Sequence, residues 1–274
     1  MRLRSLFVVG ALVLATIGGP DRQSLTVAAD VAQVSVTPVP CSKAGFELRF
    51  GNSGSTAVYA DAFLEASTPL TLSRRLVSSY LPPGYTLKVP ISVNAPRGTA
   101  PGSYSVQIKA GDQKLTLPVQ VGEPPTETTG NLARYVPVTA SSEHLPNYPA
   151  CGAVDGDRDS EHWAKTTGWN DSTKGAFPDW LQVAFDGPQT VGRVDLYTLN
   201  SKQYPAAGYG LKDWDVQAMV DGSWQTVAEV RGNTAGLKSS TFTPVTATAV
   251  RIRTLASNEG PTYSRVVELE VYRN

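Results

Sequence analysis

Apolar and polar residues alternate along two segments of the first half of the chain. Positions 87, 89, 91 and 93 are all apolar, and so are positions 115, 117, 119 and 121. Phe46, Leu48 and Phe50 follow the same pattern. Because successive side chains of a strand point to opposite faces of a sheet, this period of two predicts strands with one buried face.

Turn-forming residues separate these segments. They occur at residues 51–54, 82–84, 96–98, 101–102 and 111–112, each of which contains Gly, Pro or both. Short strands joined by such turns predict an antiparallel β-sandwich. Residues 122–130 have no apolar period and contain two adjacent prolines, which predicts a short, fairly stiff linker.

The second half of the chain shows the same alternation. Its apolar sets lie at positions 194 and 196, at 214, 216, 218 and 220, at 250 and 252, and at 267, 269 and 271. No segment after the N-terminal region has the period of a long helix. The fold class predicted is therefore all-β, with two β-sandwich domains.

The N-terminus has the layout of a secretory signal. Basic residues in the first four positions precede an apolar run from Leu6 to Ile17, which is too short to span a hydrocarbon core of about 30 Å. We predict a signal peptide over residues 1–29 and a secreted product. Cleavage after Ala29 and cleavage nearer Gly18 and Gly19 are both compatible with the sequence.

The net charge limits the kinds of partner that the chain can bind, and the cysteine content limits it to a single possible disulfide. Lys and Arg total 24, as do Asp and Glu, so the zero net charge gives no attraction for a polyanion, and nucleic acid is not expected as a partner. No further apolar run has membrane length. Cys41 and Cys151 either form a disulfide, which needs their Cα atoms within about 7 Å, or remain two separate thiols.

Residues 131–274 resemble the factor V/VIII type C (discoidin) domain. The resemblance rests on Asn131-Leu132-Ala133, Ala140-Ser141-Ser142, residues 153–157, Trp163 and the closing run 267–272, with further motifs at 179–183, 191–194, 213–217 and 249–253. The family implies a jelly-roll β-sandwich that binds ligands at its loop tips. Its bacterial branch consists largely of family 32 carbohydrate-binding modules.

Residues 31–121 resemble the Ig-like, NPCBM-associated domain found beside the catalytic domains of bacterial α-galactosidases. The turn motifs at 51–54 and 81–85 and the run 96–104 carry this resemblance. It implies a spacer or packing unit without a binding site of its own.

Asp155-Gly156-Asp157 is a candidate calcium loop. A flexible glycine between two carboxylates lets both side chains and nearby carbonyls converge on one hard cation, although the same triplet can be a simple turn. The discoidin resemblance implies a structural Ca²⁺ and the following ligands: the carbonyls of Gly152 and Val267, the side chains of Asp155, Asp157 and Ser160, and the carboxylate of Glu268. One extra residue before Trp163 makes Asp159 an alternative to Ser160.

Loop aromatics and polar residues are candidates for sugar binding. An aromatic ring covers the apolar face of a pyranose, and the sugar hydroxyls need converging donors and acceptors. The main candidates are Trp169, Asn200, Lys202, Tyr204, Tyr263 and Arg265, and their three loops also offer the polar residues Asn170, Asp171, Gln203, Asn258 and Glu259. The resemblance implies that Tyr263 is the platform, and Lys202 stands nearest to the place of an arginine in galactose-binding relatives. Arg265 has two alternative roles, pairing with Glu268 or covering the sheet edge.

These features together predict a secreted, non-catalytic carbohydrate-binding protein whose partner is a glycan or polysaccharide. With only two histidines and no nucleophile, zinc or phosphate-loop motif, we assign no catalytic residue. Two alternatives stay open. One is an adhesion module for protein or lipid headgroups, and the other is an accessory part of a glycoside hydrolase system.

Overall fold

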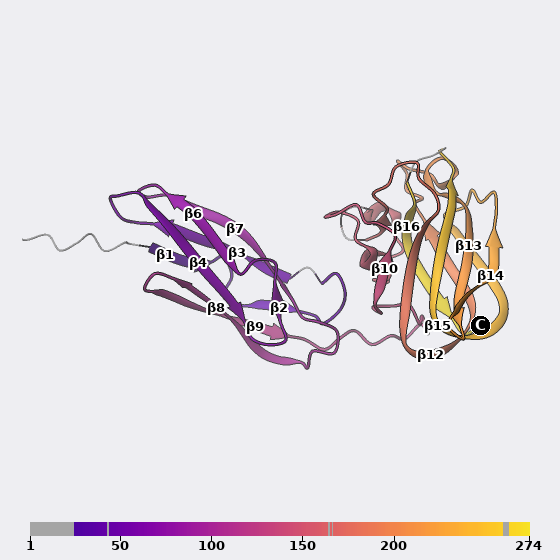
Figure 1. Cartoon of the computed structure of the whole chain (residues 1–274), viewed down its shortest axis with the longest axis horizontal. Helices are drawn as coiled ribbons and strands as arrows, with labels where there is room; N and C mark the ends of the chain where they lie inside the picture. The colour runs from indigo at the N-terminus through magenta and orange to yellow at the C-terminus, as the bar shows by residue number, and fades with distance from the viewer. Residues whose placement is uncertain (1–24, 43, 164, 166, 260–262) are drawn as a thin grey trace, which may run out of the picture.

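The computed structural model describes residues 25–42, 44–163, 165, 167–259 and 263–274. It confirms the all-β prediction: two sandwiches with separate hydrophobic cores lie end to end (Figure 1). Residues 1–24 of the predicted signal peptide lie outside the described residues. None of the described helices has the length and apolar character that a membrane span requires.

The first sandwich consists of two sheets. The first has the order β1-β3-β7-β5 and the second the order β2-β9-β8-β4-β6. The strands are β1 (Leu25–Ala29), β2 (Val34–Val36), β3 (Ala44–Asn52), β4 (Val58–Ala66), β5 (Thr71–Leu72), β6 (Leu76–Leu81), β7 (Thr86–Asn94), β8 (Gly102–Ala110) and β9 (Gln113–Val121). The alternating apolar side chains meet between the sheets, where Leu48, Phe50 and Ile108 are completely buried.

The first strand begins inside the segment that we predicted to be signal peptide. Residues 25–29 form β1 and pair with β3 in register from Leu25 opposite Asn52 to Ala29 opposite Leu48. Leu25 is buried in the core. The sheet thus includes five residues that precede the domain start predicted at residue 31, and of the two predicted cleavage positions only the one nearer Gly18 and Gly19 leaves β1 intact.

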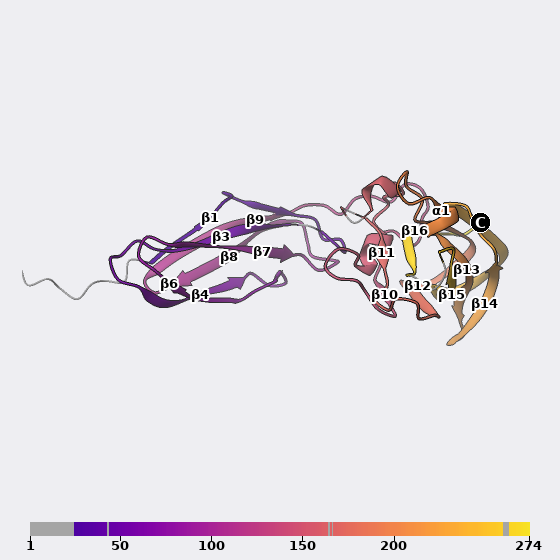
Figure 2. The same cartoon turned by 90° about the horizontal axis from the view of Figure 1, so that it is seen from above.

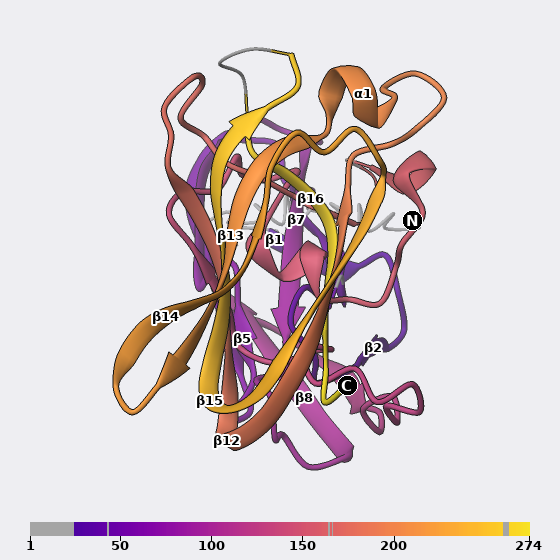
Figure 3. The ribbon, with the colours of Figure 1, turned by 90° about the vertical axis from the view of Figure 1, so that its right-hand side faces the viewer.

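The second sandwich is one strongly curled sheet. Its order is β11-β16-β12-β15-β13-β14, and β10 pairs with β12. The strands are β10 (Val138–Ala140), β11 (Trp169–Asn170), β12 (Asp179–Thr198), β13 (Leu211–Val220), β14 (Ser223–Val230), β15 (Leu237–Ser257) and β16 (Arg265–Tyr272). The long strands β12 and β15 pair along most of their length with two register shifts, and these irregularities let the sheet curl (Figure 3).

The largest core side chains of the second sandwich lie inside the curled sheet. Trp169, Trp214 and Leu181 have no exposed surface. Loops with little regular structure lie at one end. They include the 3₁₀ helices η1 (Ala150–Ala153) and η2 (Ser160–His162) and the short helix α1 (Ala206–Tyr209). Figure 2 shows α1 and β11 on the same domain, seen from above.

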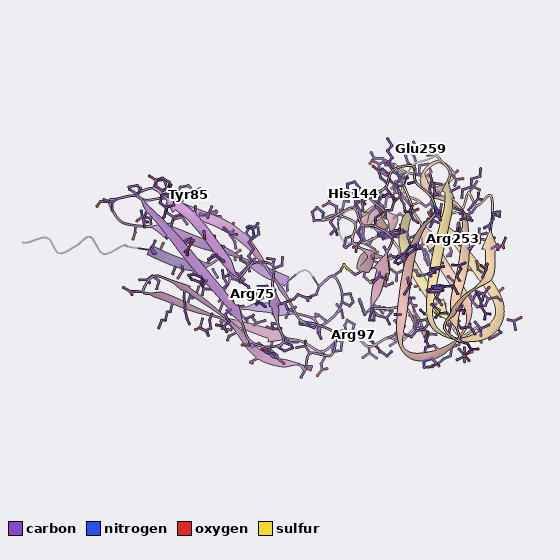
Figure 4. The ribbon with its side chains drawn as sticks, viewed as in Figure 1. Arg75, Tyr85, Arg97, His144, Arg253 and Glu259 are labelled. Atoms are coloured by element: carbon purple, nitrogen blue, oxygen red, sulfur yellow. A yellow bond between two sulfur atoms is a disulfide. The ribbon has the colours of Figure 1, made fainter. Side chains whose placement is uncertain are left out.

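The two sandwiches are joined by more than the linker. Cys41 and Cys151 form a disulfide with their Cα atoms 5.6 Å apart, and its sulfur atoms are visible between the domains in Figure 4. Arg97 of the first sandwich donates two hydrogen bonds to the carboxylate of Asp186 in the second, with Nη2 2.7 Å from Oδ2. These contacts, from two places on each domain, restrict how the sandwiches move relative to each other.

Candidate binding site at the loop end of the second sandwich

Five oxygen atoms from distant parts of the chain converge beside β16. The hydroxyl of Thr167 lies at their centre. Its Oγ1 is 2.9 Å from the carbonyl oxygen of Gly152, 3.2 Å from that of Asp157 and 3.4 Å from that of Val267. The carboxylate Oδ1 of Asp155 is 3.3 Å away. Since the Thr167 hydroxyl has one proton, it donates a full hydrogen bond to at most one of these four acceptors. Two of them also accept backbone hydrogen bonds at 2.8 Å, the Gly152 carbonyl from the N–H of Gly168 and Asp155 Oδ1 from the N–H of Asp157.

Glu268 places a second carboxylate at this cluster. Its Oε1 accepts a hydrogen bond from the backbone N–H of Gly156 at 3.0 Å, while its Oε2 is buried without a partner. Burial raises the pKa of the Glu268 carboxyl well above its ordinary value, and the nearby charge of Asp155 raises it further. Such a set of buried, electron-rich oxygens fits a hard divalent cation.

Carbonyl and hydroxyl oxygens are essential to this donor set. In the described residues no three side chains of His, Cys, Asp or Glu cluster closely enough to hold a metal by themselves. The sequence prediction placed Gly152, Asp155, Val267 and Glu268 in the set, and the structure brings all four together. Asp157 is also present, but through its carbonyl, because its carboxylate binds the imidazole of His162 and the N–H of Asp159.

Ser160 does not belong to the cluster. Its hydroxyl accepts a hydrogen bond from the backbone N–H of Asn200, which holds the loop after β12. The alternative, Asp159, caps η2 by accepting from the N–H of Glu161. The hydroxyl that we expected from Ser160 is supplied by Thr167, which follows Trp163 instead of preceding it.

A cavity of about 330 Å³ opens at the same end of the domain. It is lined by His144, Tyr148, Trp163, Asn170, Leu199, Tyr204, Tyr209, Tyr263 and Arg265. Six of these nine side chains are aromatic or imidazole rings. In Figure 4 the labels of His144 and Glu259 mark loops of the second sandwich.

Close packing holds the rings on one side of the cavity in place. The rings of Tyr148 and Trp163 lie 4.9 Å apart at 38°. Trp163 also packs on the backbone of Gly168, where φ is +94° and a Cβ atom would lie 2.2 Å from the indole ring. Only glycine permits both this conformation and this approach.

On the other side of the cavity, the residue between Tyr263 and Arg265 is firmly anchored. Ser264 is completely buried. Its N–H donates to Asp171 Oδ1 at 2.6 Å, and its hydroxyl donates to Asp179 Oδ2 at 2.8 Å. Both carboxylates are buried, and burial raises the pKa of Asp179. The anchor fixes where the side chains of Tyr263 and Arg265 enter the cavity.

Arg265 begins β16 and pairs with Asn170 of β11. Its guanidinium carbon lies 5.5 Å from the ring centroid of Tyr263 and 6.0 Å from that of Tyr209, and its Nη1 donates to the carbonyl of Tyr209 at 3.2 Å. It forms no salt bridge with any described carboxylate, including that of Glu268. The alternative role that paired these two residues is therefore wrong.

Three of the six predicted sugar-binding residues line the cavity, namely Tyr204, Tyr263 and Arg265. Trp169 is a correction: its ring is completely buried in the core, and its Nε1 donates to the carbonyl of Ser142, so no face is left for a sugar. Asn200 and Lys202 are not in the lining.

Asn200 and Lys202 instead shape the loop that carries Tyr204. The side-chain oxygen of Asn200 accepts from the N–H of Ala206 at 3.0 Å. The backbone N–H of Lys202 donates to the carboxylate of Glu161 at 2.8 Å, and the Lys202 side chain is exposed to solvent.

Other lining residues escaped the sequence-based site. These are His144, Tyr148, Trp163, Leu199 and Tyr209, whereas Asn170 belongs to a loop that the sequence already offered. The density of rings in residues 144–163 is the signal that could have identified this loop, since the core takes only small aliphatic side chains from it, those of Ala150, Ala153 and Val154, and does not account for the rings.

Residues 137–269 match the model of the F5/8 type C domain family. A search of curated proteins gave no match. Among solved structures, the chain is 30% identical to chitosan-binding module 1 of a chitosanase/glucanase from Paenibacillus sp. IK-5, with 52% of this chain and 98% of that one covered and a TM-score of 0.43. It is 24% identical to the family 32 carbohydrate-binding module of C. perfringens NanJ in complex with galactose, covering 49% and 91%, with a TM-score of 0.41. It is 21% identical to a Streptococcus pneumoniae fucose binding module, covering 54% and 100%, with a TM-score of 0.46.

Proposed function

Residues 137–269 are an F5/8 type C domain, and from this we propose that the chain is a secreted, non-catalytic protein that binds carbohydrate through its second sandwich. The glycan would occupy the ring-lined cavity at the loop end of that sandwich. Family 32 carbohydrate-binding modules share this fold.

The cavity itself is the observation that carries the proposal. Tyr204 and Tyr263 offer ring surface for the apolar face of a pyranose, while His144, Asn170 and Arg265 offer polar groups for its hydroxyls. Each sugar hydroxyl exchanges a water partner for a protein partner. We therefore expect weak binding, with Kd between about 1 μM and 1 mM.

We propose that a structural Ca²⁺ is held by the oxygen cluster around Thr167. Its ligands would come from Gly152, Asp155, Asp157 and Thr167, together with the carbonyl of Val267 and the carboxylate of Glu268. The buried, unpartnered Oε2 of Glu268 supports this, because an anionic oxygen in that position is costly without a cation. The ion would supply positive charge that fixes loops, and would take no part in chemistry.

The first sandwich is proposed to be a spacer of the Ig-like, NPCBM-associated kind. Its separate core and its disulfide to the second sandwich suit a rigid support. Such domains accompany bacterial glycosidases, so a glycoside hydrolase is a proposed partner. A disulfide between two domains also suits the oxidising environment of an exported protein.

The absence of a carboxylate pair in the cavity supports binding without hydrolysis. Glycoside hydrolysis commonly needs two carboxylates on opposite sides of the scissile bond, and the described lining contains neither Asp nor Glu.

One observation favours the alternative, a module for lipid headgroups. Leu145, beside His144, is 62% exposed on the loop end. A single apolar side chain contributes only about 1.5–3 kcal/mol on burial, which is too little for stable membrane attachment. Sedimentation with phosphatidylserine vesicles, with a Leu145→Ser variant as control, separates the two functions.

The proposal is tested by retention on insoluble polysaccharides. The chain from residue 25 to residue 274 is mixed with cellulose, chitin, xylan and pectin particles, and the bound fraction and the released reducing sugar are both measured. We expect retention on at least one polymer without sugar release. Sugar release would contradict the non-catalytic assignment, and absence of retention from a folded protein on every polymer would contradict carbohydrate binding in this form.

A further inference from the structure

Resting on the proposed glycan site, we infer that the cavity selects a sugar residue that carries a carboxylate, such as a uronic or sialic acid, with Arg265 as the group that recognises it.

The first argument is the state of the Arg265 guanidinium. The group has five N–H donors, and one of them is satisfied by the hydrogen bond from Nη1 to the carbonyl of Tyr209. No described carboxylate lies within salt-bridge distance. Burial lowers the pKa of Arg265 from its ordinary value, and the charges of Glu259 and Asp171 offset this only in part, so the guanidinium is partly desolvated. A positive charge in this condition favours an anionic partner.

The second argument is the charge of the surroundings. The carboxylates whose charges act on Arg265 belong to Glu259 and Asp171. Asp171 is fully buried and already accepts hydrogen bonds from Ser264 and Thr173. Glu259 is exposed on the loop after β15, where solvent screens it. The described lining of the cavity therefore has one permanent positive charge and no negative charge.

The third argument is geometry. The planar guanidinium forks its N–H donors in the pattern that a carboxylate accepts with two parallel hydrogen bonds. The rings of Tyr209 and Tyr263 lie 6.0 Å and 5.5 Å from the guanidinium carbon and limit its movement. A pyranose stacked on Tyr263 would therefore place a carboxyl substituent close to a fixed partner. The same arrangement repels an amino sugar, so chitosan is a poor ligand for this cavity.

The test compares ligands with and without a carboxylate. Affinity electrophoresis of the chain from residue 25 to residue 274 is run through gels that contain polygalacturonate or its methyl ester, with dextran sulfate as a general polyanion. Isothermal titration then compares 3′-sialyllactose with lactose and with chitotriose. Because a hydrogen bond to a charged group contributes about 1.5–3 kcal/mol, we expect a preference of roughly tenfold or more for the carboxylated member of a pair.

Three variants locate the effect. Arg265→Gln should reduce the preference to about twofold or less, and Arg265→Lys should keep part of it, since the charge remains while the fork is lost. Lys202→Gln removes a cation that is exposed outside the cavity and should leave the preference unchanged. Should Arg265→Gln fail to fold, the lysine variant still tests the fork.

The possible outcomes separate this inference from the proposed function. Loss of the preference in Arg265→Gln alone supports the inference. Equal binding of neutral and carboxylated ligands overturns the inference and leaves carbohydrate binding intact. The same holds if dextran sulfate retains the chain as well as polygalacturonate does, or if chitotriose binds more tightly than 3′-sialyllactose. Binding to no glycan at all overturns the proposed function together with the inference.

Discussion

Substitution of Glu268 by glutamine should have opposite effects in the presence and in the absence of calcium. In the absence of the ion, the native side chain holds an unpartnered Oε2 in the protein interior, close to the carboxylate of Asp155. Glu268→Gln removes that buried charge. We expect the variant to melt at a higher temperature than the native chain in chelator, and to gain little when calcium is added.

The magnitude for the native chain follows from linkage between binding and folding. A ligand present at a hundredfold excess over its Kd stabilises the folded state by about 2.7 kcal/mol. For a domain of this size, each kcal/mol raises the melting temperature by about 3–4 °C. Calcium should therefore raise the melting temperature of the second sandwich by about 8–11 °C.

The assay is differential scanning calorimetry in EDTA and in calcium, with Glu270→Gln as the matched control. Glu270 lies on the same strand and is also buried, but its carboxylate pairs with Arg158 at 2.6 Å. The Glu270→Gln control should melt at a lower temperature than the native chain both in EDTA and in calcium. Calcium should still raise its melting temperature by the same amount as that of the native chain. Identical melting of the native chain in EDTA and in calcium would refute the reasoning.

Three further predictions concern the rest of the molecule. Tyr204→Ala and Tyr263→Ala should each weaken glycan binding by about fivefold or more, since a ring contact contributes about 1 kcal/mol or more, and unchanged Kd values in titration calorimetry would remove these rings from the site. Deleting Leu25–Ala29 should lower the melting temperature of the first sandwich, because the β3 edge loses its partner, and mass spectrometry of the exported chain should find its N-terminus before Leu25. Replacing Cys41 and Cys151 by serine should broaden the distribution of interdomain distances in small-angle X-ray scattering while each core keeps its own melting transition; an unchanged distribution would show that the linker and the Arg97–Asp186 pair suffice.

The sequence was most informative where one physical rule dominates. The alternation at positions 87–93 and 115–121 reports burial of one strand face, and both segments are strands in the structure, β7 and β9. The calcium candidates were identified differently: Asp155 by the Asp-Gly-Asp pattern of its loop, and Glu268 by the resemblance to the discoidin family.

It was least informative where a residue type has two common uses. Trp169 and Trp163 both stand in loop-like sequence, yet the first fills the core and the second lines the cavity. Their roles depend on the pairing of β11 with β16, which is set by residues about a hundred positions away. The sequence named Ser160 instead of Thr167 as the hydroxyl of the oxygen cluster for a similar reason. The path of the loop between these two residues decides which hydroxyl reaches the cluster.

The central claim, that the second sandwich binds glycans in its ring-lined cavity, is tested most directly by a glycan array. The chain from residue 25 to residue 274 is compared, in the presence of calcium, with its Tyr204→Ala/Tyr263→Ala variant. The melting temperatures of the two proteins are first shown to be the same. We predict binding of the native chain to a defined set of glycans and loss of that binding in the variant. Equal binding by both proteins, or no binding by the folded native chain, would contradict the claim.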